Sequence, residues 1–117
     1  MKKLIVTLLV FVFAAGCSGA TPSEYTIVEQ KVNIGGKSTA RIYTEDVSEK
    51  NIEAIVTDLR MNDFFGSGSI HVFIHEPPSE GLEEFGKLVA TAKYAHTVAG
   101  KAQVGVEETG EVYIEFE

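Results

Sequence analysis

Alternation of apolar and polar side chains predicts that most of the chain after residue 24 forms β-strands. The period of two that is typical of a strand recurs in six stretches: residues 25–34, 38–44, 69–75, 88–98, 103–108 and 111–116. Turns are predicted at Gly35-Gly36, Gly100-Lys101 and Thr109-Gly110, because glycine accepts the positive φ that tight hairpin turns require. Segment 76–87 is rich in proline and glycine, so we expect a loop there with one helical turn at 82–85.

The period changes between residues 48 and 62, where apolar side chains recur as they do on one face of a helix. The positions i, i+3, i+4 and i+7 are occupied by Ile52, Ile55, Val56 and Leu59. We expect Ser48 to cap the N-terminus of this helix, since its hydroxyl can accept a hydrogen bond from a free amide of the first turn.

Together these elements predict an α+β domain with a mixed, mostly antiparallel sheet of about six strands and one helix packed on one face. The succession of strand, helix and strand over residues 38–75 predicts a crossover between parallel neighbours. The helix should cover the aliphatic side of strand 69–75, which carries Ile70, Val72 and Ile74. A sheet of this kind can leave its other face in water, so a functional surface is sought there.

Aromatic side chains at strand positions form the candidate binding face on that uncovered side. They are Tyr43, His71, Phe73, His75, Tyr94 and Tyr113. Aromatic residues on an open surface are common anchors for a partner. The alternative is that loop 76–87 folds over this side and that the same residues form a second small core. Both interpretations stay open at this level.

The first seventeen residues have the layout of a secretory signal. Lys2 and Lys3 precede an apolar run over residues 4–15, which is well below the roughly 20 apolar residues of a membrane span. The closing residues Ala14-Ala15-Gly16-Cys17 resemble the lipobox of the bacterial lipoprotein signal, with alanine where leucine is usual. The resemblance implies cleavage after Gly16 and a diacylglyceryl group on Cys17. The alternatives are an uncleaved anchor helix and a plain secreted protein.

Three segments follow from this interpretation: a signal peptide at residues 1–16, a lipidated Cys17 with a flexible tether at 17–24, and one α+β domain at 25–117. Cys17 is the only cysteine, so the domain holds no internal disulfide. The predicted location is the extracytoplasmic face of the cell membrane. The seven tether residues reach at most roughly 25 Å when extended, which keeps the domain close to the membrane.

The net charge of the chain limits the classes of partner that it can bind. Seventeen acidic residues face ten basic ones, and the formal charge moves from −7 to −9 once Lys2 and Lys3 leave with the signal. An acidic domain is a poor ligand for nucleic acid, which binds proteins through its phosphates. Anionic lipid headgroups would repel it as well, so membrane attachment is assigned to the acyl chains on Cys17.

Two motifs resemble parts of a phosphate-binding and a metal-binding site, but we assign neither function to them. Gly36-Lys37-Ser38 resembles the end of a P-loop, but Lys31 stands where that motif needs its first glycine, and strand-like residues follow where it needs a helix. His71 and His75 lie four residues apart, or roughly 13 Å along a strand. Two ligands of one zinc ion each lie about 2 Å from the metal. A pair of His71 with the remote His96 stays geometrically possible, but nothing in the sequence requires it. We therefore expect no metal site and no cofactor.

Catalysis is not predicted either. The chain lacks a Gly-x-Ser-x-Gly elbow, its only cysteine is assigned to lipid, and a single small sheet with one helix offers little depth for a dry pocket. The opening Tyr25-Thr26-Ile27-Val28 and the stretch Ala92-Lys93-Tyr94-Ala95 resemble small lipoproteins of Gram-positive bacteria and their mobile elements.

The function expected from these features is a membrane-proximal interaction module that binds or blocks another envelope protein, as an exclusion or immunity lipoprotein would. The alternatives are an accessory ligand-binding lipoprotein of a transporter and, less favoured, a hydrolase of envelope polymers. A flat aromatic face would favour the first of these functions, and a deep cleft with a buried carboxylate would favour the hydrolase.

Overall fold

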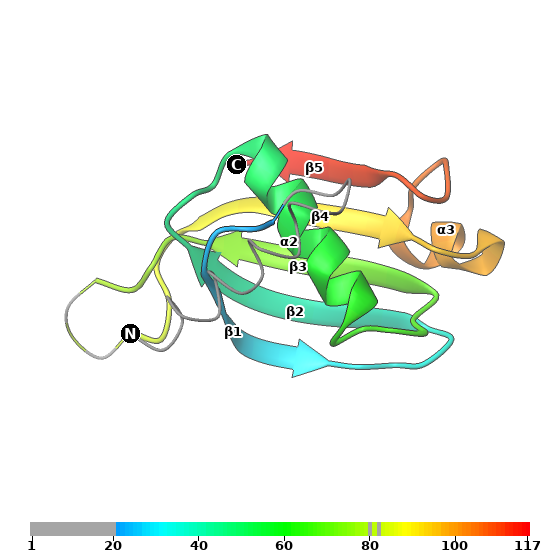
Figure 1. Ribbon diagram of the computed structural model, residues 1–117, viewed down its shortest axis with the longest axis horizontal. Coiled ribbons are helices and arrows are strands. Elements are labelled where there is room, and N and C mark those ends of the chain that lie inside the picture. Colours follow the sequence, from blue (N-terminus) through cyan, green and yellow to red (C-terminus); the bar gives the residue numbers. More distant parts are fainter. Residues whose placement is uncertain (1–20, 80, 82) are drawn as a thin grey trace.

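The computed structural model describes residues 21–79, 81 and 83–117 (Figure 1). The predicted signal peptide, the lipidation site Cys17 and the first tether residues lie outside this described part, and so does one residue of the helical turn predicted at 82–85. Within it, the elements follow one another as β1 (Tyr25–Lys31), β2 (Lys37–Thr44), α2 (Glu49–Met61), β3 (Ser69–His75), β4 (Leu88–Ala95), α3 (Val98–Val104) and β5 (Val112–Phe116).

The strands form one mixed sheet in the order β1-β2-β3-β4-β5. Strands β2 and β3 are parallel and are joined through α2, whereas the other neighbouring pairs are antiparallel. The α+β class, the mixed sheet and the parallel pair at the crossover are therefore confirmed.

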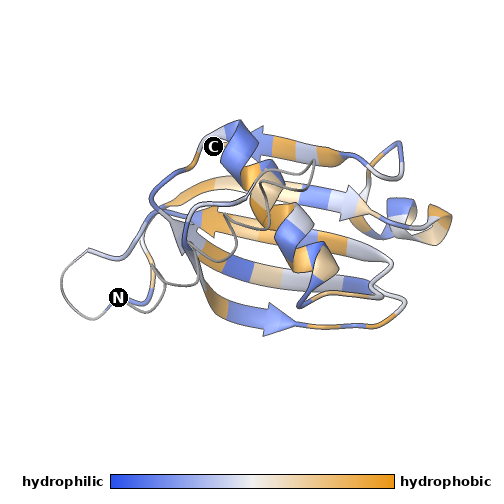
Figure 2. Ribbon diagram, viewed as in Figure 1, coloured by the Kyte–Doolittle hydropathy of each residue, from blue (hydrophilic) through white to orange (hydrophobic). Residues whose placement is uncertain are grey.

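Helix α2 lies across one face of the sheet (Figure 1), and hydrophobic residues recur along the helix and the strands beneath it (Figure 2). Its predicted apolar stripe is buried together with Ile70, Val72 and Ile74 of β3, as expected. Ser48 caps the helix and accepts a hydrogen bond from the amide of Asn51. Burial of these aliphatic side chains supplies the main stabilisation of the domain.

The strand predicted at residues 103–108 is wrong, because the chain forms helix α3 over Val98–Val104. Thr97 caps this helix, and Gly105 ends it with a left-handed φ of 74°. Gly100, taken as part of a turn, lies inside α3 and packs against the backbone of Gly68. The described sheet therefore has five strands where about six were predicted, and the described part of the chain has a second helix.

Candidate functional site

The face of the sheet opposite α2 gathers most of the predicted binding residues, because the strand register aligns them in rows. Tyr43 pairs with His75, and Thr26 of β1 pairs with Tyr43. The next rows run Arg41-Phe73-Thr91-Glu115 and Thr39-His71-Lys93-Tyr113. Since directly paired residues point to the same side of a sheet, Tyr43, His71, Phe73, His75 and Tyr113 share this side. It is called the uncovered face below.

Tyr94 is the exception, and its assignment to the uncovered face is wrong. It pairs with Ile70 on one side and Val112 on the other, which places it on the face under α2. Its side chain is 7% exposed, and the guanidinium of Arg60 lies 5.3 Å from the centre of its ring. The strand alternates as predicted, but the side on which Tyr94 falls depends on the pairing with β3.

Arg41 joins the uncovered face to the loop that follows β3. Its Nη1 lies 2.7 Å from Nε2 of His75, and Nδ1 of His75 lies 2.8 Å from the carbonyl oxygen of Gly86. A guanidinium can only donate, so Nε2 accepts from Arg41, and Nδ1 carries the proton that it donates to Gly86. The same guanidinium lies 4.8 Å from the ring centre of Phe73 and 5.2 Å from that of Phe85. Arg41 was not among the residues predicted for the binding face. The alternation along β2, which puts Arg41 on the same side as Tyr43, was the sequence signal that could have identified it.

The loop covers only one end of the uncovered face. Phe85 stacks on His75 with ring centroids 4.3 Å apart, and His75 is 4% exposed. Tyr43, His71, Phe73 and Tyr113 are half-buried. The interpretation as a second core therefore applies at His75, and the interpretation as an open surface applies to the rest of the face.

His71 lies between Phe73 and two lysines. The ring centroids of His71 and Phe73 are 4.6 Å apart. Partial burial lowers the pKa of His71 below its usual value, and the ammonium groups of Lys93 and Lys37 lower it further. The neutral imidazole is therefore the form that the folded domain favours.

We expect the free energy of unfolding to rise between about pH 5 and about pH 7, and the substitution His71→Gln to reduce that rise. The pKa of His71 is lower in the folded domain than in an unfolded chain, where it is about 6.5. The unfolded state therefore takes up the proton first as the pH falls. The stability that depends on neutral His71 is complete above about pH 6.5 and is lost below it.

Urea unfolding of both proteins across this range measures the effect. His75 and the carboxylates are the same in both, so the difference between the two pH profiles isolates His71. The exposed His96 provides the matched substitution His96→Gln, which also removes one histidine but leaves His71 in place. Parallel profiles for the wild type and His71→Gln would contradict the assignment.

Charge is distributed unevenly between the uncovered face and the rest of the molecule. The face carries four of the ten basic residues, Lys31, Lys37, Arg41 and Lys93, and only two of the seventeen acidic ones, Glu29 and Glu115. The strand positions of the face are therefore net positive, whereas the end of the face where β1 begins is lined by Glu24, Glu45 and Asp46.

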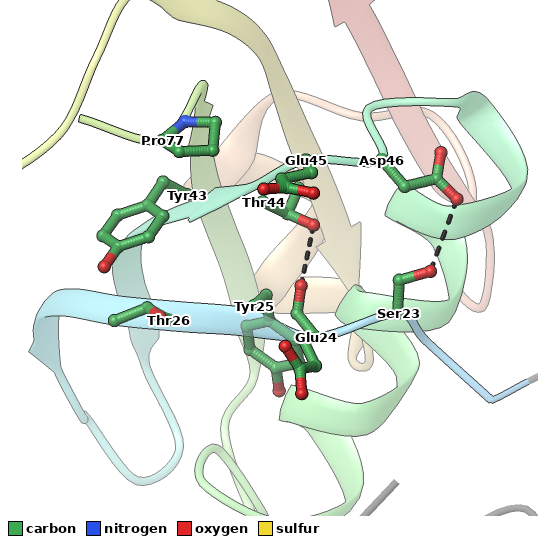
Figure 3. A pocket seen from close by; sticks show the side chains of 9 residues that line it. All are labelled: Ser23, Glu24, Tyr25, Thr26, Tyr43, Thr44, Glu45, Asp46 and Pro77. Carbon is green, nitrogen blue, oxygen red and sulfur yellow. Dashed lines mark hydrogen bonds between the residues drawn. The ribbon is translucent and has the colours of Figure 1, made fainter. Parts of the chain in front are cut away.

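The relief of the uncovered face is shallow. A depression of about 380 Å³ lies at the end of the face where β1 begins, between Tyr43, Pro77 and the segment 23–26 (Figure 3). A depression of about 210 Å³ lies beside Phe73 toward β1, and one of about 150 Å³ lies toward β5, lined by Lys93 and Tyr113 among others. Phe73 and its neighbour His71 on β3 lie between the last two depressions and are called the ridge below. The two smaller depressions are of a size that fits single side chains.

The segment before β1 is fixed to the folded domain at this same end. The amide of Ser23 donates to Oδ1 of Asn51 at 2.7 Å. The hydroxyl of Thr44 donates to the carbonyl of Glu24 at 2.9 Å (Figure 3). The hydroxyl of Tyr25 donates to Asp58 at 2.6 Å. Burial, with Asp58 close by, raises the pKa of Tyr25 and keeps the phenol protonated as that donor. The chain therefore enters the domain at a defined point at the start of β1, held by contacts on the side of the sheet that carries α2.

His75 and Lys37, which belong to the metal-like and phosphate-like motifs of the sequence, have defined places in the fold. Among residues 21–79, 81 and 83–117, no three His, Cys, Asp or Glu side chains are grouped so that they could hold a metal ion. Both ring nitrogens of His75 are engaged, by Arg41 and by Gly86. Lys37 begins strand β2, so the glycines before it do not lead into the helix that a P-loop requires.

Comparisons with known proteins found no protein-family model, curated protein or solved structure that matches this chain. In the described part of the chain, no helix is long and apolar enough to cross a membrane.

Proposed function

We propose that this chain is a lipid-anchored interaction module on the extracytoplasmic face of the cell membrane, which binds or blocks another envelope protein and catalyses no reaction. The observation that carries this proposal is the uncovered face, where partly exposed aromatic side chains lie among four cationic ones. Half-buried aromatic and arginine side chains are the residue types that contribute most to protein interfaces. The shallow relief of the face suits a protein surface better than an enclosed small molecule.

The place where the chain enters the domain supports a partner close to the membrane. Ser23 is hydrogen-bonded to α2, so six residue steps separate the predicted anchor Cys17 from this fixed point. Six residue steps reach roughly 20 Å when extended. The uncovered face then extends along strands of up to eight residues, which is about 25 Å. The partner must therefore present its contact surface within roughly 45 Å of the bilayer.

Photocrosslinking on intact cells tests the proposal. A photoreactive amino acid at Thr91, which lies in the same row as Phe73 on the uncovered face, is expected to capture one envelope protein. The matched control carries the same amino acid at Glu53, which is exposed on the far side of α2. A second control, Cys17→Ser, removes the predicted anchor and should abolish capture.

Equal capture from Thr91 and Glu53 would show that the uncovered face is not the contact surface. The absence of any captured protein from either position on the anchored form would refute an interaction module. Capture that survives Cys17→Ser unchanged would refute the role of the anchor.

A further inference from the structure

We propose that the uncovered face binds an acidic segment of the partner protein, with carboxylates set among Lys37, Arg41 and Lys93 and an aromatic or aliphatic side chain against Phe73. This inference rests on the proposed function and names the chemistry of its partner. It follows from the charge of the face, the chemistry of its central arginine and the ridge between its depressions.

Charge complementarity gives the sign of the partner. The uncovered face carries four basic and two acidic residues, whereas the rest of the chain from Cys17 onward carries four basic and fifteen acidic ones. The domain as a whole is acidic and repels anions at long range. Attraction of an anion therefore depends on the basic residues of the uncovered face. An acidic segment is complementary in charge to the strand positions of this face.

The central arginine already contacts a carboxylate. Nε of Arg41 donates to Oε1 of Glu29 at 3.4 Å, and the side chains of the two residues are 29% and 65% exposed. An exposed pair of this kind contributes little stability, so a carboxylate of the partner can take the place of Glu29 at small cost. The contact with His75 and the ring of Phe73 beneath it hold the guanidinium in position. Arg41 is thus ordered before the partner arrives, which lowers the entropy cost of binding.

The domain itself contains an example of a side chain that packs against this guanidinium. Phe85 comes from a segment that begins with Glu83 and Glu84, and its ring lies 5.2 Å from the guanidinium carbon of Arg41 and 4.3 Å from the ring of His75. An aromatic ring that follows two acidic residues in the sequence therefore already packs at one end of the face. The ridge of His71 and Phe73, with a depression of about 210 Å³ on one side and about 150 Å³ on the other, offers similar places along its length.

An anionic bilayer is the less favoured occupant. The depression at the end where the tether enters is lined by Glu24, Glu45 and Asp46 (Figure 3). Hydrogen bonds from Ser48 lower the pKa of Asp46, so that this carboxylate keeps its charge. These groups meet anionic headgroups first and repel them.

Fluorescence anisotropy with a labelled random copolymer of L-glutamate and L-tyrosine tests the inference on the domain fused to its tether, with Cys17→Ser to keep it in solution. At about 50 mM salt we expect saturable binding that weakens as salt is added. Lys93→Glu on the uncovered face should weaken binding at least tenfold. Lys50→Glu on α2 makes the same change in net charge away from the face and should alter it less than twofold. Thermal unfolding of both variants confirms that each is folded.

The inference is overturned if the wild type does not bind the copolymer, or if the two variants weaken binding equally. It is also overturned if inorganic polyphosphate or phosphatidylglycerol vesicles bind in a manner that depends on Lys93 while the copolymer does not. These failures differ from failure of the proposed function. Capture of an envelope protein through Thr91 by a domain that ignores the copolymer would leave the module in place and refute only the acidic chemistry.

Discussion

Replacing Phe64 by alanine is expected to lower the free energy of unfolding by about 3–5 kcal/mol. Phe64 follows the end of α2, is 0% exposed and belongs to the main core cluster. Its amide also donates to the carbonyl of Leu59 at 2.7 Å, which holds the ring against the helix that it closes. Alanine leaves a cavity that the surrounding strands, fixed by their pairing, cannot fill. Urea denaturation followed by far-ultraviolet circular dichroism measures the loss.

The neighbouring residue is the matched control. Phe65 has the same side chain one position later and is 71% exposed. Phe65→Ala is therefore expected to change the free energy of unfolding by less than about 0.5 kcal/mol, as surface substitutions usually do. Similar losses for the two substitutions would mean that Phe64 is not the residue that closes the core.

Gly100→Ala is expected to destabilise the domain by about 2–3 kcal/mol, although alanine is the better helix former by about 1 kcal/mol. A Cβ at Gly100 would lie 2.1 Å from the carbonyl oxygen of Gly68. That oxygen cannot move away easily, because it accepts hydrogen bonds from the amides of His96 and Thr97 at 2.8 and 3.3 Å. The added methyl group must therefore push α3 away from the sheet. Thermal and urea unfolding of the variant measure the effect.

The control substitution Gly105→Ala distinguishes the steric conflict at Gly100 from the general effect of replacing a glycine. Gly105 ends the same helix with a φ of 74°, and nothing lies within 4 Å of a Cβ placed there. The substitution forces a left-handed conformation on alanine and should cost only about 1 kcal/mol. A Gly100→Ala variant that is as stable as the wild type would show that α3 is free to shift.

The elements with a strong local period could be predicted from the sequence. The stripe of Ile52, Ile55 and Val56 with Ser48 before it specifies α2 and its cap, and residues 69–75 alternate throughout and form β3 with these bounds. In both elements the buried positions recur with the period of the helix or the strand. The local sequence is therefore enough to predict the element. The hydrophobic side of β3 also sufficed to predict where α2 packs.

Helix α3 could not be predicted in this way. It is seven residues long, contains a glycine and buries only Gly100 and Val104. Local preference at Gly100-Lys101 favours a turn, and the decisive contact is with Gly68, thirty-two positions earlier in the chain. Such a short helix has little stability of its own, so packing against the start of β3 determines its conformation.

By itself, the sequence determined that aromatic residues alternate along the strands and that cationic residues are few, and it carries the signal-like segment that ends at Cys17. Only the tertiary structure decided which of these residues meet. The register of β3 with β4 places Tyr94 under α2, and that of β4 with β5 brings Tyr113 to the uncovered face. The physical reason is that alternation defines two sides of each strand, whereas pairing with distant strands selects the side that each one presents.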